Sequence, residues 1–88
     1  MSPEKFNSFG FKAYDWVEVV YSEGKRKLSI RVQLQQGEAL EALWEKQLNE
    51  KSKKQEDVLI RRPSLVYVGD SPFGDIIELW KVDDIKRV

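Results

Sequence analysis

The chain has 88 residues, of which 41% are hydrophobic and 34% charged, and its 15 basic and 15 acidic residues cancel. This length allows one domain with a modest core. The balanced charge provides no overall field to steer the protein onto nucleic acid or an anionic membrane, although it permits a local basic patch. The absence of cysteine and histidine removes disulfides, thiolate nucleophiles, and the commonest general base and metal ligand.

The N-terminal segment, residues 1–12, places three phenylalanines among turn-forming polar residues. We expect a Phe-rich arm here, followed by a single domain that spans residues 13–88. Two interpretations are open. The rings of Phe6, Phe9 and Phe11 either close an edge or face of the core, or form an arm that inserts into another subunit or partner.

Residues 14–21 and 27–35 predict an antiparallel hairpin. The first segment is rich in β-branched and aromatic residues, and the second alternates apolar and polar residues. Gly24 in the connecting turn can take a positive φ. The second segment is expected to face the core with Leu28, Ile30, Val32 and Leu34.

Residues 37–50 predict an amphipathic helix, because four apolar residues are spaced at i, i+3, i+4 and i+8. Residues 57–62 either continue this helix until Pro63 ends it or form a short edge strand. The apolar face consists of Leu40, Leu43, Trp44 and Leu48.

Residues 65–69 and 76–82 predict a second hairpin around a turn at residues 69–75, and residues 83–88 predict a polar tail or a final helical turn. The order is therefore strand, strand, helix, strand, strand. We expect a small α+β domain, in which one amphipathic helix packs on an antiparallel sheet of four strands, or five if residues 57–62 are extended.

Aromatic residues suggest a protein interface. Trp16 and Trp80 lie on predicted strands that carry apolar groups on both faces, and one helix cannot cover both faces of a sheet. Either the Phe-rich arm or another molecule covers the second face. Phe73 occupies a predicted turn, where its ring either folds back or contacts a partner. The interface candidates are Phe6, Phe9, Phe11, Trp16, Phe73 and Trp80.

Two clusters of basic residues suggest nucleic-acid binding as the alternative, with phosphate contacts beside outward aromatic rings. The first cluster lies at the predicted hairpin tip and the second near the C-terminal end of the predicted helix. A solvated turn and the helix dipole explain these clusters without a ligand. The candidates are Lys25, Arg26, Lys27, Arg31, Lys51, Lys53, Lys54, Arg61 and Arg62.

Three weaker patterns in the sequence suggest other kinds of site. The loop at residues 70–75 has two carboxylates that suit a hard cation, but its composition is also that of a tight turn. Ser64 follows two arginines, a pattern of basic-directed phosphorylation that often arises by chance. Glu18 and Glu78 lie among apolar neighbours and would be an acid-base pair only if buried together.

We therefore expect a small non-catalytic module for protein–protein interaction or self-association, with a homodimer as one form. Nucleic-acid binding is the alternative, and a carboxylate enzyme is a distant third. We expect no metal, cofactor or small-molecule substrate. No apolar run has the length of a membrane span, and the N-terminal residues lack the apolar segment of a signal peptide, so a cytoplasmic location is expected. A short gene on a mobile element is a natural source for such a chain.

Overall fold

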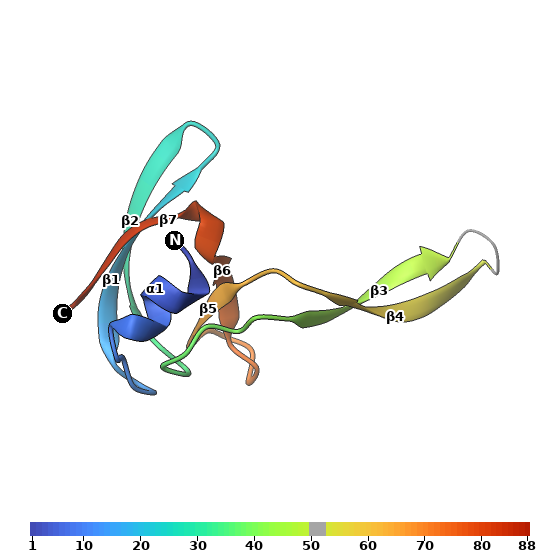
Figure 1. Ribbon diagram of the computed structural model, residues 1–88, viewed down its shortest axis with the longest axis horizontal. Helices are drawn as coiled ribbons and strands as arrows, with labels where there is room; N and C mark the ends of the chain where they lie inside the picture. Colours follow the sequence, from blue (N-terminus) through green and yellow to red (C-terminus); the bar gives the residue numbers. More distant parts are fainter. Residues whose placement is uncertain (50–52) are drawn as a thin grey trace.

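The computed structural model describes residues 1–49 and 53–88 and consists mainly of strands (Figure 1). The predicted α+β architecture is wrong, because the only α-helix among the described residues is a short N-terminal one. The elements are α1 (Pro3–Ser8), β1 (Trp16–Glu23), β2 (Arg26–Gln33), β3 (Leu43–Asn49), β4 (Lys54–Ile60), β5 (Ser64–Tyr67), β6 (Asp75–Glu78), the 3-10 turn η1 (Leu79–Lys81) and β7 (Val82–Arg87).

The first hairpin is confirmed. β1 and β2 pair antiparallel from Trp16 opposite Gln33 to Glu23 opposite Arg26. Gly24 in the two-residue turn has φ +60°, a backbone conformation that glycine adopts without a steric penalty. β1 is the central strand of a three-stranded sheet in the order β2-β1-β7.

The third strand of this sheet was missed from the sequence. Residues 82–87 form β7, so the predicted polar tail or helical turn is wrong. The pairing of β7 with β1 shifts register between Val20 and Tyr21, so that Tyr21 lies opposite Val82 and Val19 opposite Ile85. This bulge buries Val82 and Ile85 together, although they are three positions apart in sequence, a spacing that breaks the alternation expected of a strand.

The second hairpin is confirmed in its paired part, because β5 and β6 run antiparallel. The residues after β6 form η1 rather than the end of a strand. The backbone links this hairpin to the end of β2: Gln35 donates to Val66 (2.9 Å) and Val68 donates to Gln33 (2.7 Å). Hydrogen bonding is therefore continuous from β7 through β1 and β2 to β5 and β6, and it positions two hairpins around one core.

The Phe-rich N-terminal segment contributes directly to that core. Ser2 caps α1 by accepting a hydrogen bond from the Lys5 amide (3.1 Å), and Phe6 on this helix is fully buried. Figure 1 shows α1 lying beside β1 and β7. The buried cluster consists of Phe6, Val17, Val19, Leu34, Leu65, Ile77, Leu79, Val82 and Ile85.

The amphipathic helix predicted at residues 37–50 does not exist within its described part. Residues 43–49 form β3, and Leu40 makes an isolated bridge to Ser64. An apolar helical stripe needs a sheet face to cover, and here α1 and η1 already supply the buried Phe6 and Leu79 to the core. Glu50, the predicted end of this helix, and the side chain of Trp44 lie outside the part that the structure describes.

The alternative of an extended segment at residues 57–62 is the correct one. Residues up to Ile60 belong to β4, and Arg61 and Arg62 follow directly after it. β4 pairs antiparallel with β3 from Leu43 opposite Ile60 to Asn49 opposite Lys54. This β3–β4 hairpin projects away from the rest of the protein, which we call the body, along the longest dimension of 48 Å (Figure 1).

Burial of Phe6 should make it the most sensitive residue of the N-terminal segment. We expect Phe6→Ala to lower the free energy of unfolding by about 3 kcal/mol, because it removes a large side chain and leaves a cavity. Urea titration followed by tryptophan fluorescence measures this change. Phe9→Ala is the matched control, since Phe9 is exposed, and equal losses for the two variants would contradict the core assignment.

Candidate protein-binding surface

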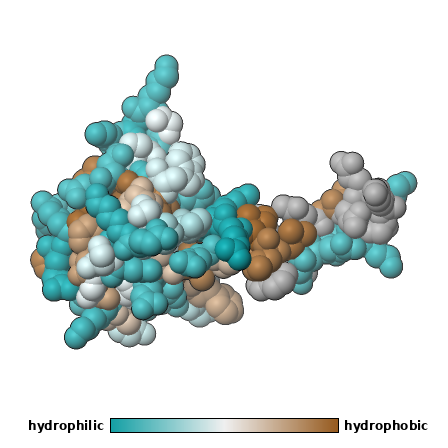
Figure 2. Space-filling view, in the orientation of Figure 1, coloured by the Kyte–Doolittle hydropathy of each residue, from teal (hydrophilic) through white to brown (hydrophobic). Residues whose placement is uncertain are grey.

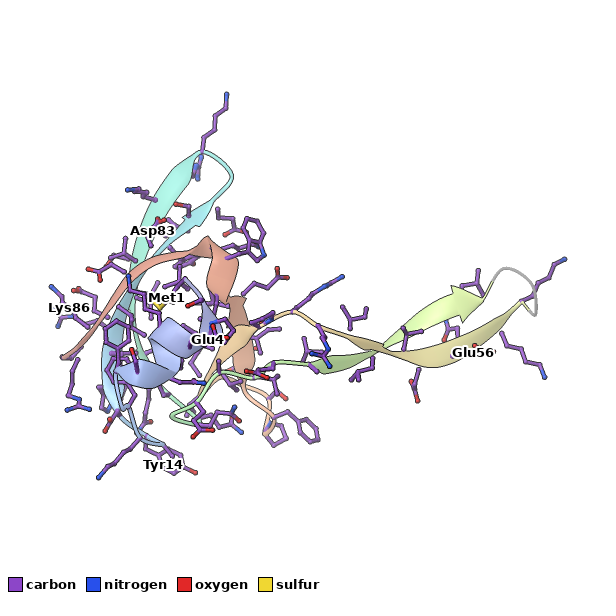
Figure 3. All side chains as sticks on the ribbon, viewed as in Figure 1. Met1, Glu4, Tyr14, Glu56, Asp83 and Lys86 are labelled. Atoms are coloured by element: carbon purple, nitrogen blue, oxygen red, sulfur yellow. The ribbon has the colours of Figure 1, made fainter. Side chains whose placement is uncertain are left out.

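The β3–β4 hairpin exposes apolar side chains on both of its faces. Leu48 is 64% exposed, Leu59 is 49% exposed and Val58 is 37% exposed. Consecutive residues of a strand point to opposite faces, so Val58 and Leu59 cannot both turn toward one covering layer. Figure 3 shows side chains along the hairpin extending to both sides of the ribbon, far from Lys86 on β7. The exposed set therefore lies on an element that the body does not cover.

The outer edge of the hairpin is a second feature of this element. β3 and β4 form a two-stranded sheet of their own, so the edge of β4 turned away from β3 has no strand beside it among the described residues. Such an edge carries backbone donors and acceptors that can pair with another strand. The residues on β4 are exposed throughout, except for half-buried Ile60 at its base.

An apolar groove lies where the hairpin joins the body. The space-filling view shows hydrophobic atoms gathered at this junction (Figure 2). Phe73, on the turn between β5 and β6, borders the groove and is 85% exposed. Its ring is therefore offered to solvent rather than folded back onto the core. The apolar residues along the groove are Leu40, Leu43, Val66, Phe73 and Ile76.

The two described tryptophans that were predicted as interface residues are both exposed, but they lie on different elements. Trp16 begins β1, whereas Trp80 is in η1 and is 72% exposed. The indole NH of Trp80 donates to the Glu78 carboxylate, and the Lys81 ammonium lies 5.3 Å from the ring centroid. Trp80 is thus held in place at the surface by its neighbours.

The outer face of β1, which the sequence suggested as an apolar interface, carries ion pairs instead. The Glu18 carboxylate lies 3.0 Å from the Lys86 ammonium and 3.7 Å from the Arg31 guanidinium. The hydrogen bond and charge of Lys86 hold the pKa of Glu18 below its ordinary value. This lowered pKa opposes the role of general acid considered for Glu18 with Glu78.

The Phe-rich segment is engaged by the protein itself. The ring of Phe11 lies 5.9 Å from that of buried Phe6 and 5.5 Å from that of Phe9. The Arg87 guanidinium lies 5.6 Å from the Phe11 ring and 3.3 Å from the Asp15 carboxylate. Of the three phenylalanines, only Phe9 therefore presents an exposed ring.

The basic residues proposed for nucleic-acid binding are spread over three places. Lys25, Arg26 and Lys27 lie at the tip of the β1–β2 hairpin, with Arg31 further along β2 beside Glu18. The remaining described residues lie on the projecting hairpin, at its far end or at its base. Figure 1 shows the two hairpin tips pointing in different directions. The second group consists of Lys53, Lys54, Arg61 and Arg62, and Lys51 lies outside the described residues.

The remaining candidates have structural roles. In the loop at residues 70–75, the Gly74 amide donates to the Ser71 carbonyl (2.9 Å) and Gly74 has φ +78°, which is the geometry of a turn. Within the described part of the chain, no group of three or more acidic side chains is placed to hold a metal ion. The predicted phosphorylation site Ser64 is fully buried, and its hydroxyl donates to the Arg62 carbonyl (2.8 Å).

A second hollow lies on the body between β1 and the β5–β6 hairpin. Tyr21, Tyr67 and Lys81 are among the residues that line it. Burial, together with the nearby Asp75 carboxylate, raises the pKa of Tyr67. Its phenol therefore stays protonated near neutral pH and can donate a hydrogen bond rather than act as a base.

Comparison with protein-family models, with curated proteins and with solved structures found no match to this chain. No family is assigned. None of the helices in the described residues has the length and apolar character needed to cross a membrane. A function can therefore be inferred only from the exposed surfaces of the protein. Among these surfaces, the β3–β4 hairpin was not predicted from the sequence. The sequence feature that indicates this hairpin is the β-branched and apolar run at residues 58–60, which favours a strand.

The hairpin should be dispensable for folding of the body. We expect replacement of residues 43–60 by a short Gly-Ser linker to change the free energy of unfolding by less than about 1 kcal/mol, because shortening a surface loop costs little. Leu43 lies opposite Ile60, so a short linker spans the gap. Urea titration and circular dichroism measure the result. Loss of the folded state would show instead that the hairpin supports the core.

The Glu18 ion pairs should make stability depend on pH. Because the folded-state pKa is lowered, their contribution is present above the unfolded value of about 4.5 and is lost as the pH falls through the folded value. We expect Glu18→Gln to lower the urea midpoint at pH 7 and to match the parent protein near pH 2. Glu23→Gln, at the exposed end of the same strand, is the control, and an equal effect of both variants at pH 7 would contradict this account.

Proposed function

We propose that this chain is a non-catalytic protein-interaction module whose binding element is the β3–β4 hairpin. One observation carries the proposal: the hairpin projects from the body, exposes apolar residues on both faces and, within the described residues, has no further strand beside the outer edge of β4. The proposal keeps the class of function expected from the sequence. It moves the binding surface from the outer face of β1 and the N-terminal arm to the hairpin.

Energetics favour a partner for this element. A two-stranded hairpin by itself is at best marginally stable in water. Full burial of a leucine or valine side chain contributes roughly 1.5–3 kcal/mol. Because Leu48, Val58 and Leu59 are largely exposed, much of this free energy would be gained only when a partner buries them. A partner that covers the hairpin would therefore stabilise both the hairpin and the complex.

The outer edge of β4 indicates how such a partner binds. Addition of a strand to an exposed edge supplies backbone hydrogen bonds, and side chains along the edge supply specificity. Phe73 and Trp80 are exposed on the neighbouring part of the body, and aromatic residues of this kind are common anchors at interfaces. Strand addition with aromatic contacts at the base of the hairpin is the mode that fits these features.

The nucleic-acid alternative receives less support. The basic residues are divided between two hairpin tips and the hairpin base, and Arg31 is paired with Glu18. A phosphate-binding surface needs its cations along one path.

The cytoplasmic location stays part of the proposal, supported by a chain that has no cysteine and no disulfide to form.

Site-specific photo-crosslinking in cells that express the full chain tests the proposal. A benzophenone amino acid at Leu59 or Leu48 should give a discrete protein adduct, identified by mass spectrometry, because these side chains would lie within the interface. The same amino acid at Ser29, exposed on β2, is the matched control and should give none.

Absence of a discrete adduct at both hairpin positions, or identical adducts at Ser29, would overturn the proposal. An adduct that nuclease treatment removes would favour the nucleic-acid alternative. The mass of the adduct also separates two kinds of protein partner, a second copy of this chain and a different protein.

A further inference from the structure

The inner face of β1 continues beyond the core and ends in an acid. Every second residue of this strand points to the same side, where Val17 and Val19 are buried and Tyr21 packs against the core. Glu23 is the next residue in this register and is exposed. Its side chain therefore borders the hollow between β1 and the β5–β6 hairpin, whereas Glu18 lies on the outer face of the strand.

The hollow forms where the connected strands do not close. Among the described residues, β6 pairs with β5 and β7 pairs with β1, and no pairing joins β6 to β1 or to β7. The turn η1 makes the connection from β6 to β7 instead. The volume of the hollow, about 210 Å³, is below the roughly 300–1,000 Å³ of pockets that hold drug-sized ligands, so it suits one small group.

The walls of the hollow combine two tyrosine rings with two carboxylates. Tyr21 and Tyr67 are half-buried and pack against the core, which fixes their rings. The Glu78 carboxylate accepts a hydrogen bond from the Trp80 indole NH, which holds this acid at the edge of the hollow. The Glu23 carboxylate has no hydrogen bond or ion pair within the part of the chain that the structure describes.

One cation also lines the hollow, but its ammonium lies over a neighbouring ring. The Lys81 ammonium is 5.3 Å from the centroid of the Trp80 ring, a cation–π contact. Among the described residues, no ion pair joins Lys81 to Glu23 or to Glu78. Two carboxylates against one ammonium leave a net negative charge at the hollow, and this charge favours a positively charged ligand.

The phenol of Tyr67 adds to this preference. Burial raises the pKa of Tyr67, and the charges of Asp75 and Tyr21 raise this pKa further. A neutral phenol presents a ring face to a cation and an oxygen that accepts a hydrogen bond from an ammonium group. The nearby Asp75 carboxylate, which disfavours ionisation of the phenol, stabilises a cation in the same place.

We propose that the hollow binds an organic cation of the alkylammonium class. The carboxylates of Glu23 and Glu78 attract the ammonium group, and the rings of Tyr21 and Tyr67 contact its alkyl chain. This group has two sources, a free small amine and a lysine side chain of another protein. The inference goes beyond the proposed function, because the hollow lies on the body and uses no residue of the β3–β4 hairpin.

Titration of the ¹⁵N-labelled full chain with butylammonium chloride, followed by amide chemical shifts, measures the binding. We expect saturable shifts at the residues that line the hollow, with a dissociation constant of about 1–10 mM for a ligand of so few atoms. Butanol has a similar size without the charge and should bind at least about tenfold more weakly. No saturable shift at the hollow, or equal affinity for butanol, would overturn the proposal.

Carboxylate variants test the residues that attract the cation. Glu23→Gln should weaken binding at least about threefold, and the double variant with Glu78→Gln at least about tenfold, because glutamine keeps the size and removes the charge. An amide oxygen at position 78 still accepts a hydrogen bond from the Trp80 indole. Glu38→Gln, at an exposed position after β2, is the matched control and should leave the affinity unchanged. Unchanged affinity in the double variant, with its fold verified by circular dichroism, would contradict the assignment.

A variant that tightens binding separates a direct effect of charge from a loss of folded protein. Lys81→Gln should tighten binding about threefold, because it removes the cation that repels the ligand at the edge of the hollow. Lys12→Gln, exposed before β1, is the control and should have no effect. Weaker binding by Lys81→Gln would count against the proposal.

Two probes distinguish the sources of the ammonium group. A capped Gly-Gly-Lys-Gly-Gly peptide carries the same group on a protein backbone. Binding of this peptide at the hollow, at least as tight as that of butylammonium, identifies a lysine side chain of another protein, whereas binding of butylammonium alone identifies a free amine. Both results support the alkylammonium site, and failure of both probes overturns it. Photo-crosslinking at the hairpin is measured separately, so either proposal can fail while the other holds.

Discussion

The burial of Phe6 against the strands is the interaction on which the rest of the structure depends. The sheet built around β1 presents its apolar residues to one side, and α1 supplies the ring that lies among Val17, Val19 and Ile85. Few large side chains are available for this purpose in a chain of 88 residues. The short helix α1 therefore covers the apolar face of the sheet, as a longer amphipathic helix would in a layered α+β domain. Leu79 of η1 contributes a further buried side chain to the same core.

Once this core is filled, the described residues of β3 and β4 have no apolar face of the body left to cover. Its apolar residues are satisfied only in part, by cross-strand contacts within a hairpin that projects from the body. A strand edge and apolar side chains that remain exposed on such an element are unusual without a partner, because they favour aggregation. The same constraint that determines the fold thus also produces the surface to which we assign function.

Local patterns in the sequence predicted the β1–β2 and β5–β6 hairpins, because strand alternation and turn residues can be recognised within a few consecutive positions. The helix at residues 37–50 was predicted from spacing alone, and spacing cannot show that α1 already occupies the place where that helix would pack. β7 was missed because a bulge opposite Val20 and Tyr21 breaks the alternation. The sequence left open whether Trp80 and Phe73 are covered or exposed, and the structure exposes both. The outer edge of β4 was not predicted, since an edge is defined only by which strands lie beside it.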